Sequence, residues 1–151
     1  MPKISAGILL YRVISGFPEV LLFHPGGPFW AKKDKGVWSI AKGELTENET
    51  LLDGAIRELE EESGIKLRGE LMALNPVRQN SSKIVYAWAL RQDFNPSDLK
   101  SNTFEMVWPP GSGILRQFPE MDRAAWFAFP EAKEKIIAGQ LPLLLELENR
   151  I

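Results

Sequence analysis

The chain contains no cysteine and only one histidine, His24, and these scarcities exclude several chemistries. Without thiols there are no disulfide bonds, no thiolate catalysis, no zinc–cysteine site and no iron–sulfur cluster. A single imidazole excludes a metal site built from several histidines and leaves little room for a serine–histidine–aspartate triad. A lone histidine is more often structural than catalytic, so we expect a structural role for His24, with a substrate contact as the alternative.

The chain also lacks an excess of charge and a long apolar run. Its 18 Lys and Arg residues nearly balance 20 Asp and Glu residues, so the formal net charge is -2. Binding to a nucleic-acid polymer, which requires an excess of cations, is therefore not expected. No stretch approaches the roughly 20 apolar residues that span a bilayer, and Met1–Ser5 carries no signal-peptide-like run. We expect a cytoplasmic protein without a membrane partner, a monomer or homodimer, in which residues 1–151 form one domain.

Apolar and β-branched runs alternate with turn residues along the chain, and one long segment has helical periodicity. Residues 25–36 are rich in proline, glycine and lysine and are predicted to form a loop. Strands are predicted over residues 4–13, 20–23, 37–40, 67–74, 83–90, 104–108 and 123–129, and helices over 48–63, 130–138 and 142–150. This mixture of strands and flanking helices predicts an α/β sandwich.

The first predicted helix carries an unusual group of acids. Glu58, Glu61 and Glu62 share one face, because residues three and four apart are neighbours on a helix. Glu58 and Glu62 fall at the edge of the apolar arc, where a partly desolvated carboxylate needs a partner. Arg57 neutralises only part of this charge, whereas a hard divalent cation could neutralise the rest. Gly54 lies on the same side and is expected to leave room for a metal or substrate; a solvated acidic stripe is the alternative.

Residues 43–65 resemble the 23-residue box of Nudix hydrolases. The matching positions are Gly43, then after five residues Glu49, after seven more Arg57-Glu58-Leu59, after one Glu61-Glu62, and after one Gly64-Ile65. The resemblance implies a Nudix-type α/β/α sandwich with a mixed sheet and a loop–helix–loop metal site. It further implies hydrolysis of a nucleoside diphosphate linked to another group, by water attack at phosphorus, with Mg²⁺ as cofactor and Mn²⁺ as a substitute.

The same resemblance assigns roles to individual residues. The implied metal ligands are the carboxylates of Glu58 and Glu62, the carbonyl of Gly43, and Glu61, which would be a third ligand or would position water. Arg57 would orient a box glutamate, with Glu49 as its ion partner. The general base in this family is a box glutamate or a glutamate from a downstream loop. Our downstream candidate is Glu105, for which an exposed loop position is the alternative.

The segment before the box indicates a substrate class. Trp38-Ser-Ile-Ala-Lys-Gly43 resembles Nudix enzymes that cut dinucleoside polyphosphates, although Ala41 replaces their proline and their tyrosine follows the box sooner than here. We therefore expect a small-molecule nucleotide partner, namely a dinucleoside polyphosphate such as diadenosine tetraphosphate. One alternative is a housecleaning enzyme that acts on nucleoside triphosphates or oxidised nucleotides. An alternative of another class is a Nudix module that binds nucleotides without cutting them.

Five residues are predicted to contact substrate. Lys42 is expected to touch phosphate, with a salt link to a box glutamate as the alternative. Phe29 and Trp30 are expected to stack on a base, and a hydrophobic lid or core plug is an equal alternative. Trp38 and Tyr86 are the other two predicted substrate contacts. Tyr86 lies in a strand of alternating pattern, where it is expected to face the core or to stack on a base.

Overall fold

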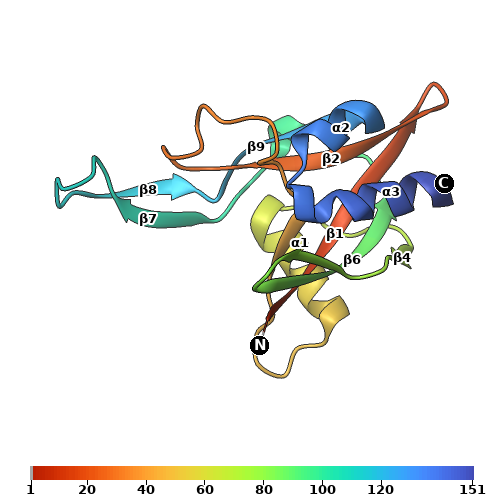
Figure 1. Ribbon diagram of the computed structural model, residues 1–151, viewed down its shortest axis with the longest axis horizontal. Helices are drawn as coiled ribbons and strands as arrows, with labels where there is room; N and C mark the ends of the chain where they lie inside the picture. Colours follow the sequence, from red (N-terminus) through yellow and green to blue (C-terminus); the bar gives the residue numbers. More distant parts are fainter. Residues whose placement is uncertain (1) are drawn as a thin grey trace.

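The computed structural model describes residues 2–151, and Met1, the first residue of the predicted domain, lies outside them. Its centre is a seven-stranded mixed sheet (Figure 1) with the order β4-β6-β1-β2-β9, in which β3 pairs with β1 and β5 with β6. β1 and β6 are parallel, and the other pairs are antiparallel. The strands are β1 (Lys3–Ile14), β2 (Phe17–Pro25), β3 (Ala41–Glu44), β4 (Leu71–Ala73), β5 (Val77–Asn80), β6 (Lys83–Arg91) and β9 (Met121–Ala128).

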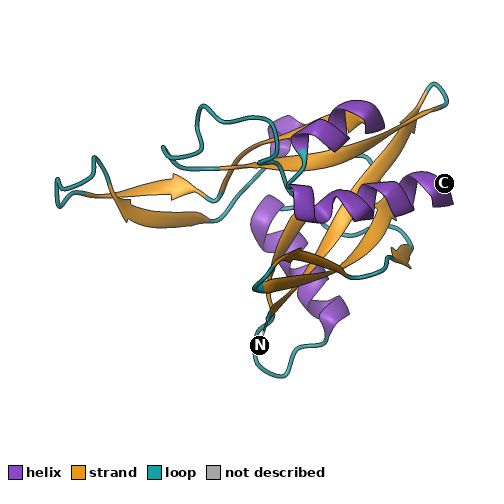
Figure 2. Ribbon diagram, viewed as in Figure 1, coloured by secondary structure: helices purple, strands orange, loops and turns teal. Residues whose placement is uncertain are grey.

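Helices cover both faces of this sheet (Figure 2). Alternate residues of β1 show why: Ile8 and Leu10 join the apolar cluster under α1, and Leu9 joins the cluster under α2 and α3. The helical elements are α1 (Leu51–Ser63), α2 (Phe129–Lys135) and α3 (Leu141–Arg150), with short 3-10 turns η1 (Pro96–Asp98) and η2 (Ala138–Gln140). The predicted α/β sandwich with a mixed sheet is confirmed. Within residues 2–151, no helix has the length and apolar character needed to cross a bilayer.

Helix α1 lies close to its predicted place because its ends are set by local chemistry. The Thr50 side chain accepts a hydrogen bond from the Asp53 N–H and caps the first turn. Gly64 ends the helix with a φ of 79°, a conformation that glycine adopts without steric cost. The predicted start at residue 48 is wrong by three residues, since Asn48 has a φ of 63° and cannot be helical.

The strand prediction fails just before the box. Residues 37–40 form no strand, and only isolated bridges join Trp38 and Ser39 to other segments. The strand is β3 instead, which pairs with β1 where Gly7 has no side chain. A Cβ on Gly7 would lie 2.5 Å from the Ala41 oxygen. This close approach brings the beginning of the box onto the sheet.

Other differences are smaller. The strand predicted over 67–74 shortens to β4, β5 forms where no strand was predicted, and the helix predicted over 130–138 ends at Lys135. The strand predicted over 104–108 forms as β7 (Thr103–Val107), but it pairs outside the main sheet with β8 (Leu115–Pro119), which was not predicted. This two-stranded ribbon projects from the sandwich (Figure 1), and its base leads directly into β9.

Candidate active site

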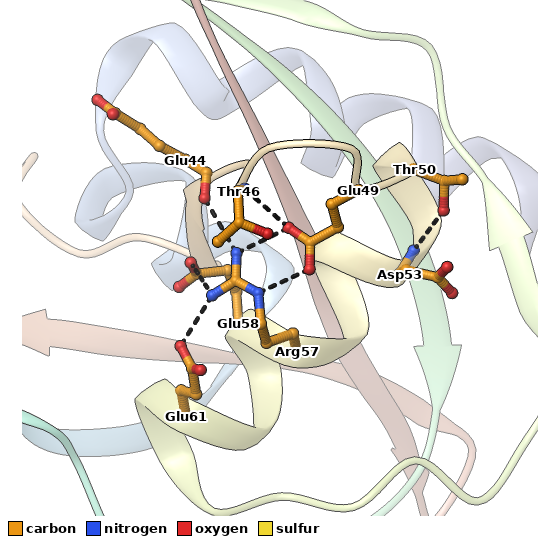
Figure 3. Close-up of polar contacts among 8 residues, drawn as sticks. All are labelled: Glu44, Thr46, Glu49, Thr50, Asp53, Arg57, Glu58 and Glu61. Carbon is orange, nitrogen blue, oxygen red and sulfur yellow. Dashed lines mark hydrogen bonds and ion pairs between the residues drawn. The ribbon is translucent and has the colours of Figure 1, made fainter.

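The guanidinium of Arg57 is the centre of a polar network at the start of the box (Figure 3). It donates two hydrogen bonds to Glu49, from Nε at 2.7 Å and from Nη2 at 2.9 Å, which is the predicted ion pair. Nη1 donates to Glu58 at 2.9 Å and to Glu61 at 2.8 Å, and Nη2 donates to the Glu44 carbonyl at 3.1 Å. Hydrogen bonds from Arg57 lower the pKa of Glu49 to about 2. The network ties α1 to the loop that precedes it.

Glu58 lies directly against Gly43. Only 7% of Glu58 is exposed, and a Cβ on Gly43 would lie 2.1 Å from its carboxylate carbon. Glycine is therefore the residue that allows β3 to pass under this side chain. Burial raises the pKa of Glu58, and nearby Glu61 and Glu120 add to the effect while Arg57 opposes it. The structure thus brings together two predicted metal ligands, the Glu58 carboxylate and the Gly43 backbone.

Glu62 faces a carboxylate that the sequence prediction missed, Glu120. Burial is the largest cause of a rise in the pKa of Glu62 to about 9, followed by a hydrogen bond with Glu120 and the charge of that residue. Two carboxyl groups this close cannot both remain charged unless a cation or a proton joins them. No local pattern marks Glu120. It reaches Glu62 because β9 pairs with β2, and the register shifts between His24 and Pro25 at that end.

Lys42 stands beside these acids in a cavity of about 250 Å³. Burial and the neighbouring Lys83 lower the pKa of Lys42 to about 8, although Glu62 and Glu58 act in the opposite direction. The alternative of a salt link is not observed, since no ion pair of Lys42 occurs in the part of the chain that the structure describes. The cavity is lined by Phe23, Pro25, Val37, Ser39, Ile40, Lys42, Glu62, Glu120, Met121 and Ile137.

A larger cavity of about 820 Å³ lies elsewhere, along residues 64–68 and 92–100. It contains none of the box glutamates, whereas the smaller cavity contains Glu62, Glu120 and Lys42. We therefore place the candidate site at the smaller cavity, because chemistry at a phosphate needs these charges.

The donor groups at this site fit a hard divalent cation. All are oxygens: the buried Glu58 carboxylate over Gly43, and the Glu62 and Glu120 carboxyl groups that line the cavity. Burial and then Glu120 raise the pKa of Glu62. A cation could replace the proton that this pair otherwise needs. Across residues 2–151, however, no three acidic side chains converge as a preformed cage, since Arg57 holds Glu58 and Glu61 by hydrogen bonds. Cation binding would therefore require some of these side chains to move.

Two residues have different roles from those expected. Trp38 was expected to contact substrate, but it is 4% exposed, donates from Nε1 to Asp34 at 2.9 Å and packs edge-on against Phe127. It belongs to the core and is not a substrate contact. Gly54 was expected to leave space for a metal or substrate, but a Cβ there would lie 2.3 Å from Leu45, so the space is filled by packing.

The remaining predicted residues have no contact that fixes their role. Glu61 is exposed, and its polar contact is with Arg57. The Glu105 carboxylate lies on the ribbon and accepts from Gln117 at 3.4 Å. The remaining three are aromatic: Phe29 and Trp30 are 62% and 36% exposed, which excludes a core plug, and Tyr86 is half-buried on β6. For these residues the predicted roles stay predictions.

Comparison with known proteins identifies the family. The family model described as the NUDIX domain matches residues 1–147. A Caenorhabditis elegans Ap4A hydrolase in a binary complex is 22% identical, with a TM-score of 0.68 over 97% of this chain and 96% of that one. The NUDIX domain of Shewanella oneidensis NrtR complexed with ADP ribose is 15% identical, with a TM-score of 0.67 over 99% and 88%. A mutT/nudix family protein from Listeria innocua is 18% identical, with a TM-score of 0.65 over 99% and 94%.

These identities are low enough that the structural likenesses establish the fold alone. No curated protein sequence matches the chain. The family model nevertheless covers nearly the whole length, the box has every expected residue, and the fold places Gly43, Glu58 and Arg57 together. The chain therefore belongs to the Nudix hydrolase family, whose members are typically divalent-metal-dependent pyrophosphohydrolases.

Proposed function

We propose that the protein is a Mg²⁺-dependent hydrolase that cleaves a dinucleoside polyphosphate of the diadenosine tetraphosphate type. Water would add to a phosphorus atom and a phosphoanhydride bond would break, giving a mononucleotide and a nucleoside triphosphate. The observation that carries the proposal is that Glu62 and Glu120 line one cavity together with Lys42, while the buried Glu58 lies over Gly43 at the start of the box. Such a cluster of acids would repel a polyphosphate unless cations were bound between them.

The residues that would hold Mg²⁺, or Mn²⁺ in its place, are Glu58, Glu62 and the Gly43 carbonyl, with Glu61 as a third carboxylate once it leaves Arg57. When bound, the metal neutralises phosphate oxygens and lowers the pKa of a coordinated water. Arg57 would keep Glu58 in place, because its position is itself fixed by two hydrogen bonds to Glu49. This arrangement orients the ligand at little entropic cost.

Proton removal from the attacking water would fall to a carboxylate close to the site. Glu105 was the downstream candidate, but its polar contact is with Gln117 on the ribbon. Glu120 is a better-placed downstream candidate, because it lines the same cavity as Lys42 and contacts Glu62. Box glutamates remain the other candidates for this role.

The nucleotide would lie between this cavity and the segment that carries Phe29 and Trp30. Lys42 supplies a cation at the cavity wall for a phosphate, and the two exposed rings offer faces for a base. Tyr86 is a further candidate for base contact. The fold likeness to an Ap4A hydrolase agrees with this substrate class, and the likeness to a domain complexed with ADP ribose makes ADP ribose a necessary comparison substrate.

The test is turnover against diadenosine tetraphosphate, deoxynucleoside triphosphates, an oxidised nucleotide and ADP ribose, with Mg²⁺ and with excess chelator. We expect ATP and AMP from diadenosine tetraphosphate, and no turnover in chelator. Two ADP molecules, or much faster cleavage of another substrate, would contradict the substrate assignment. Tight nucleotide binding without turnover would instead favour the non-catalytic module.

The metal assignment is tested by Glu58→Gln and Glu62→Gln. Each should lower kcat by at least about 100-fold, the upper end of the effect known for residues that only support metal ligands. The matched control is Glu60→Gln, since Glu60 is an exposed glutamate of the same helix. Circular dichroism should show all three variants folded. Turnover of the wild type in chelator would refute the assignment.

A further inference from the structure

The Lys33 ammonium lies over two aromatic rings of its own loop. Its Nζ is 4.2 Å from the ring centroid of Phe29 and 5.2 Å from that of Trp30. The two rings pack edge to face, with centroids 4.9 Å apart and an angle of 82° between their planes. A cation within about 6 Å of a ring centroid is attracted by the ring. The two rings therefore restrict this long side chain to one place on the surface.

The backbone of Lys33 is held as well. Its N–H donates to the Trp30 carbonyl at 2.9 Å, and its own carbonyl oxygen lies 2.6 Å from Nε2 of the buried His24 ring. The next residue, Asp34, accepts a hydrogen bond from Trp38 Nε1 at 2.9 Å. Main chain and ammonium are thus both held, which is unusual for an exposed lysine, because its side chain has much rotamer freedom to lose.

The positive charge held in this way has no counter-ion. Among the described residues, 2–151, the Lys33 ammonium takes part in no ion pair. An aromatic ring attracts a cation through its quadrupole and carries no net charge, so the ring contacts leave the ammonium without a neutralising partner. The structure therefore presents, at a defined place, a cation that is free to meet an anion.

Lys33 is anchored beside the active-site cavity. His24, whose ring contacts the Lys33 carbonyl, directly precedes Pro25 of the cavity wall. The following residue, Gly26, donates its N–H at 2.8 Å to the carbonyl of Glu120, which lines the same cavity. Lys33 itself does not line the cavity. A phosphate chain that leaves the cavity on the side of this loop would meet a second cation there, outside the place where the acids lie.

We propose that Lys33, held by Phe29 and Trp30, is a specificity-determining residue that binds the phosphates beyond the cleaved bond and so favours a tetraphosphate over a diphosphate. This inference rests on the proposed function. Inside the cavity, Lys42 and the cation-binding acids account for the phosphates next to the cleaved bond. The rest of a tetraphosphate chain lies outside and needs a further cation, whereas ADP ribose has no phosphate left to contact Lys33. Because the ammonium is already held, little side-chain entropy is lost on binding.

The first test is calorimetric binding of non-hydrolysable analogues of diadenosine tetraphosphate and of ADP ribose. Lys33→Met removes the ammonium and keeps the apolar stem. We expect the Kd of the tetraphosphate analogue to rise about tenfold, the loss typical of one hydrogen bond between charged groups, and to depend less steeply on salt. The Kd of the ADP ribose analogue should change by less than about twofold, since no contact is lost. Equal losses for both analogues, or no loss for either, would overturn the proposal.

Two further variants separate a phosphate contact from a structural role. Lys33→Arg keeps the charge and the ring contacts and should hold the Kd of the tetraphosphate analogue within about threefold of the wild-type value. Lys32→Met removes an equal charge from the same loop, at an exposed position without a ring contact in the described part of the chain, and should change that Kd by less than about twofold. An equal effect of Lys32→Met and Lys33→Met would show a general loss of charge and would contradict the proposal.

The part played by the rings is tested by a double-mutant cycle of Phe29→Leu and Lys33→Met. Phe29→Leu alone should raise the Kd of the tetraphosphate analogue about threefold, and it should have no further effect once Lys33→Met is present. Additive losses would show that Phe29 acts independently of Lys33 and would refute its role as a support. All these readouts are binding constants. If the wild type binds the analogue but does not cleave diadenosine tetraphosphate, the proposed hydrolysis fails while the Kd values still decide the role of Lys33.

Discussion

Replacing Gly43 by alanine is the sharpest test of the way the box is assembled. The added Cβ would lie 2.1 Å from the carboxylate carbon of Glu58 and within 2.3 Å of both its oxygens. Ordinary contact begins near 3.4 Å, so the carboxylate must move by about 1.3 Å. Gly43 does not have a positive φ, so the alanine causes a clash and no backbone strain. A displacement of about 1 Å in a catalytic group can lower activity by about 100-fold, and we expect kcat/KM to fall by that factor.

The cost in stability should be smaller, because the atoms that clash are the end of a flexible side chain. Moving Glu58 breaks its hydrogen bond with Arg57. Arg57 is partly exposed to solvent and keeps its hydrogen bond to Glu49. We expect the free energy of unfolding of Gly43→Ala, measured by urea unfolding, to fall by about 1–2 kcal/mol. Gly69→Ala is the matched control, since its Cβ would approach Leu90 no closer than 3.1 Å. Wild-type kcat/KM and metal affinity in Gly43→Ala would refute the assignment of Glu58 as a ligand held over the box backbone.

Three further predictions concern the surroundings of the site. Glu49→Gln should destabilise the protein at neutral pH. Because Arg57 lowers the pKa of Glu49 from 4.5 to about 2, the stabilisation by Glu49 is present above pH 4.5 and is lost as the pH falls towards 2. The unfolding free energies of the wild type and the variant should therefore converge over that range. Lys42→Met should raise KM more than it lowers kcat, whereas Lys66→Met, at an exposed position outside the cavity, should leave both constants unchanged. Leu144→Ala, at a fully buried position on α3, should cost about 2–5 kcal/mol in urea unfolding without changing metal affinity.

The parts of the fold that the sequence predicts are those fixed by neighbouring residues. The strands predicted over 4–13 and 20–23 are one example: they lie within β1 and β2, which are joined through Ser15 and Gly16, whose φ values of 51° and 83° suit a two-residue loop. The C-terminal end of α1 at Gly64 is another. The Arg57–Glu49 pair is eight residues apart in the box and was also predicted correctly. In each case the information lies within one element or across one turn.

The parts that failed depend on contacts between distant segments. β3 has the polar sequence Ala-Lys-Gly-Glu, which looks like a loop, and it becomes a strand because β1 offers a partner with glycine at the crossing point. Trp38 stands close to the box in sequence and resembles a substrate contact there. In space it fills the core between His24 and Phe127. Periodicity cannot show such placements, since it describes one element at a time.

Glu120 shows the same limit within the active site, and it also shows how the limit could be reduced. It follows a strand that was not predicted and precedes one that was, so no local pattern separated it from other surface acids. The box, however, supplies more carboxylates than Arg57 can neutralise, which implies a bound cation, and a hard cation takes further oxygen ligands. A search for an acid that the sheet order brings opposite Glu62 would have led to the β8–β9 junction rather than to Glu105. The oxygen ligands that a cation needs around a recognised motif are therefore a guide to residues that lie outside it.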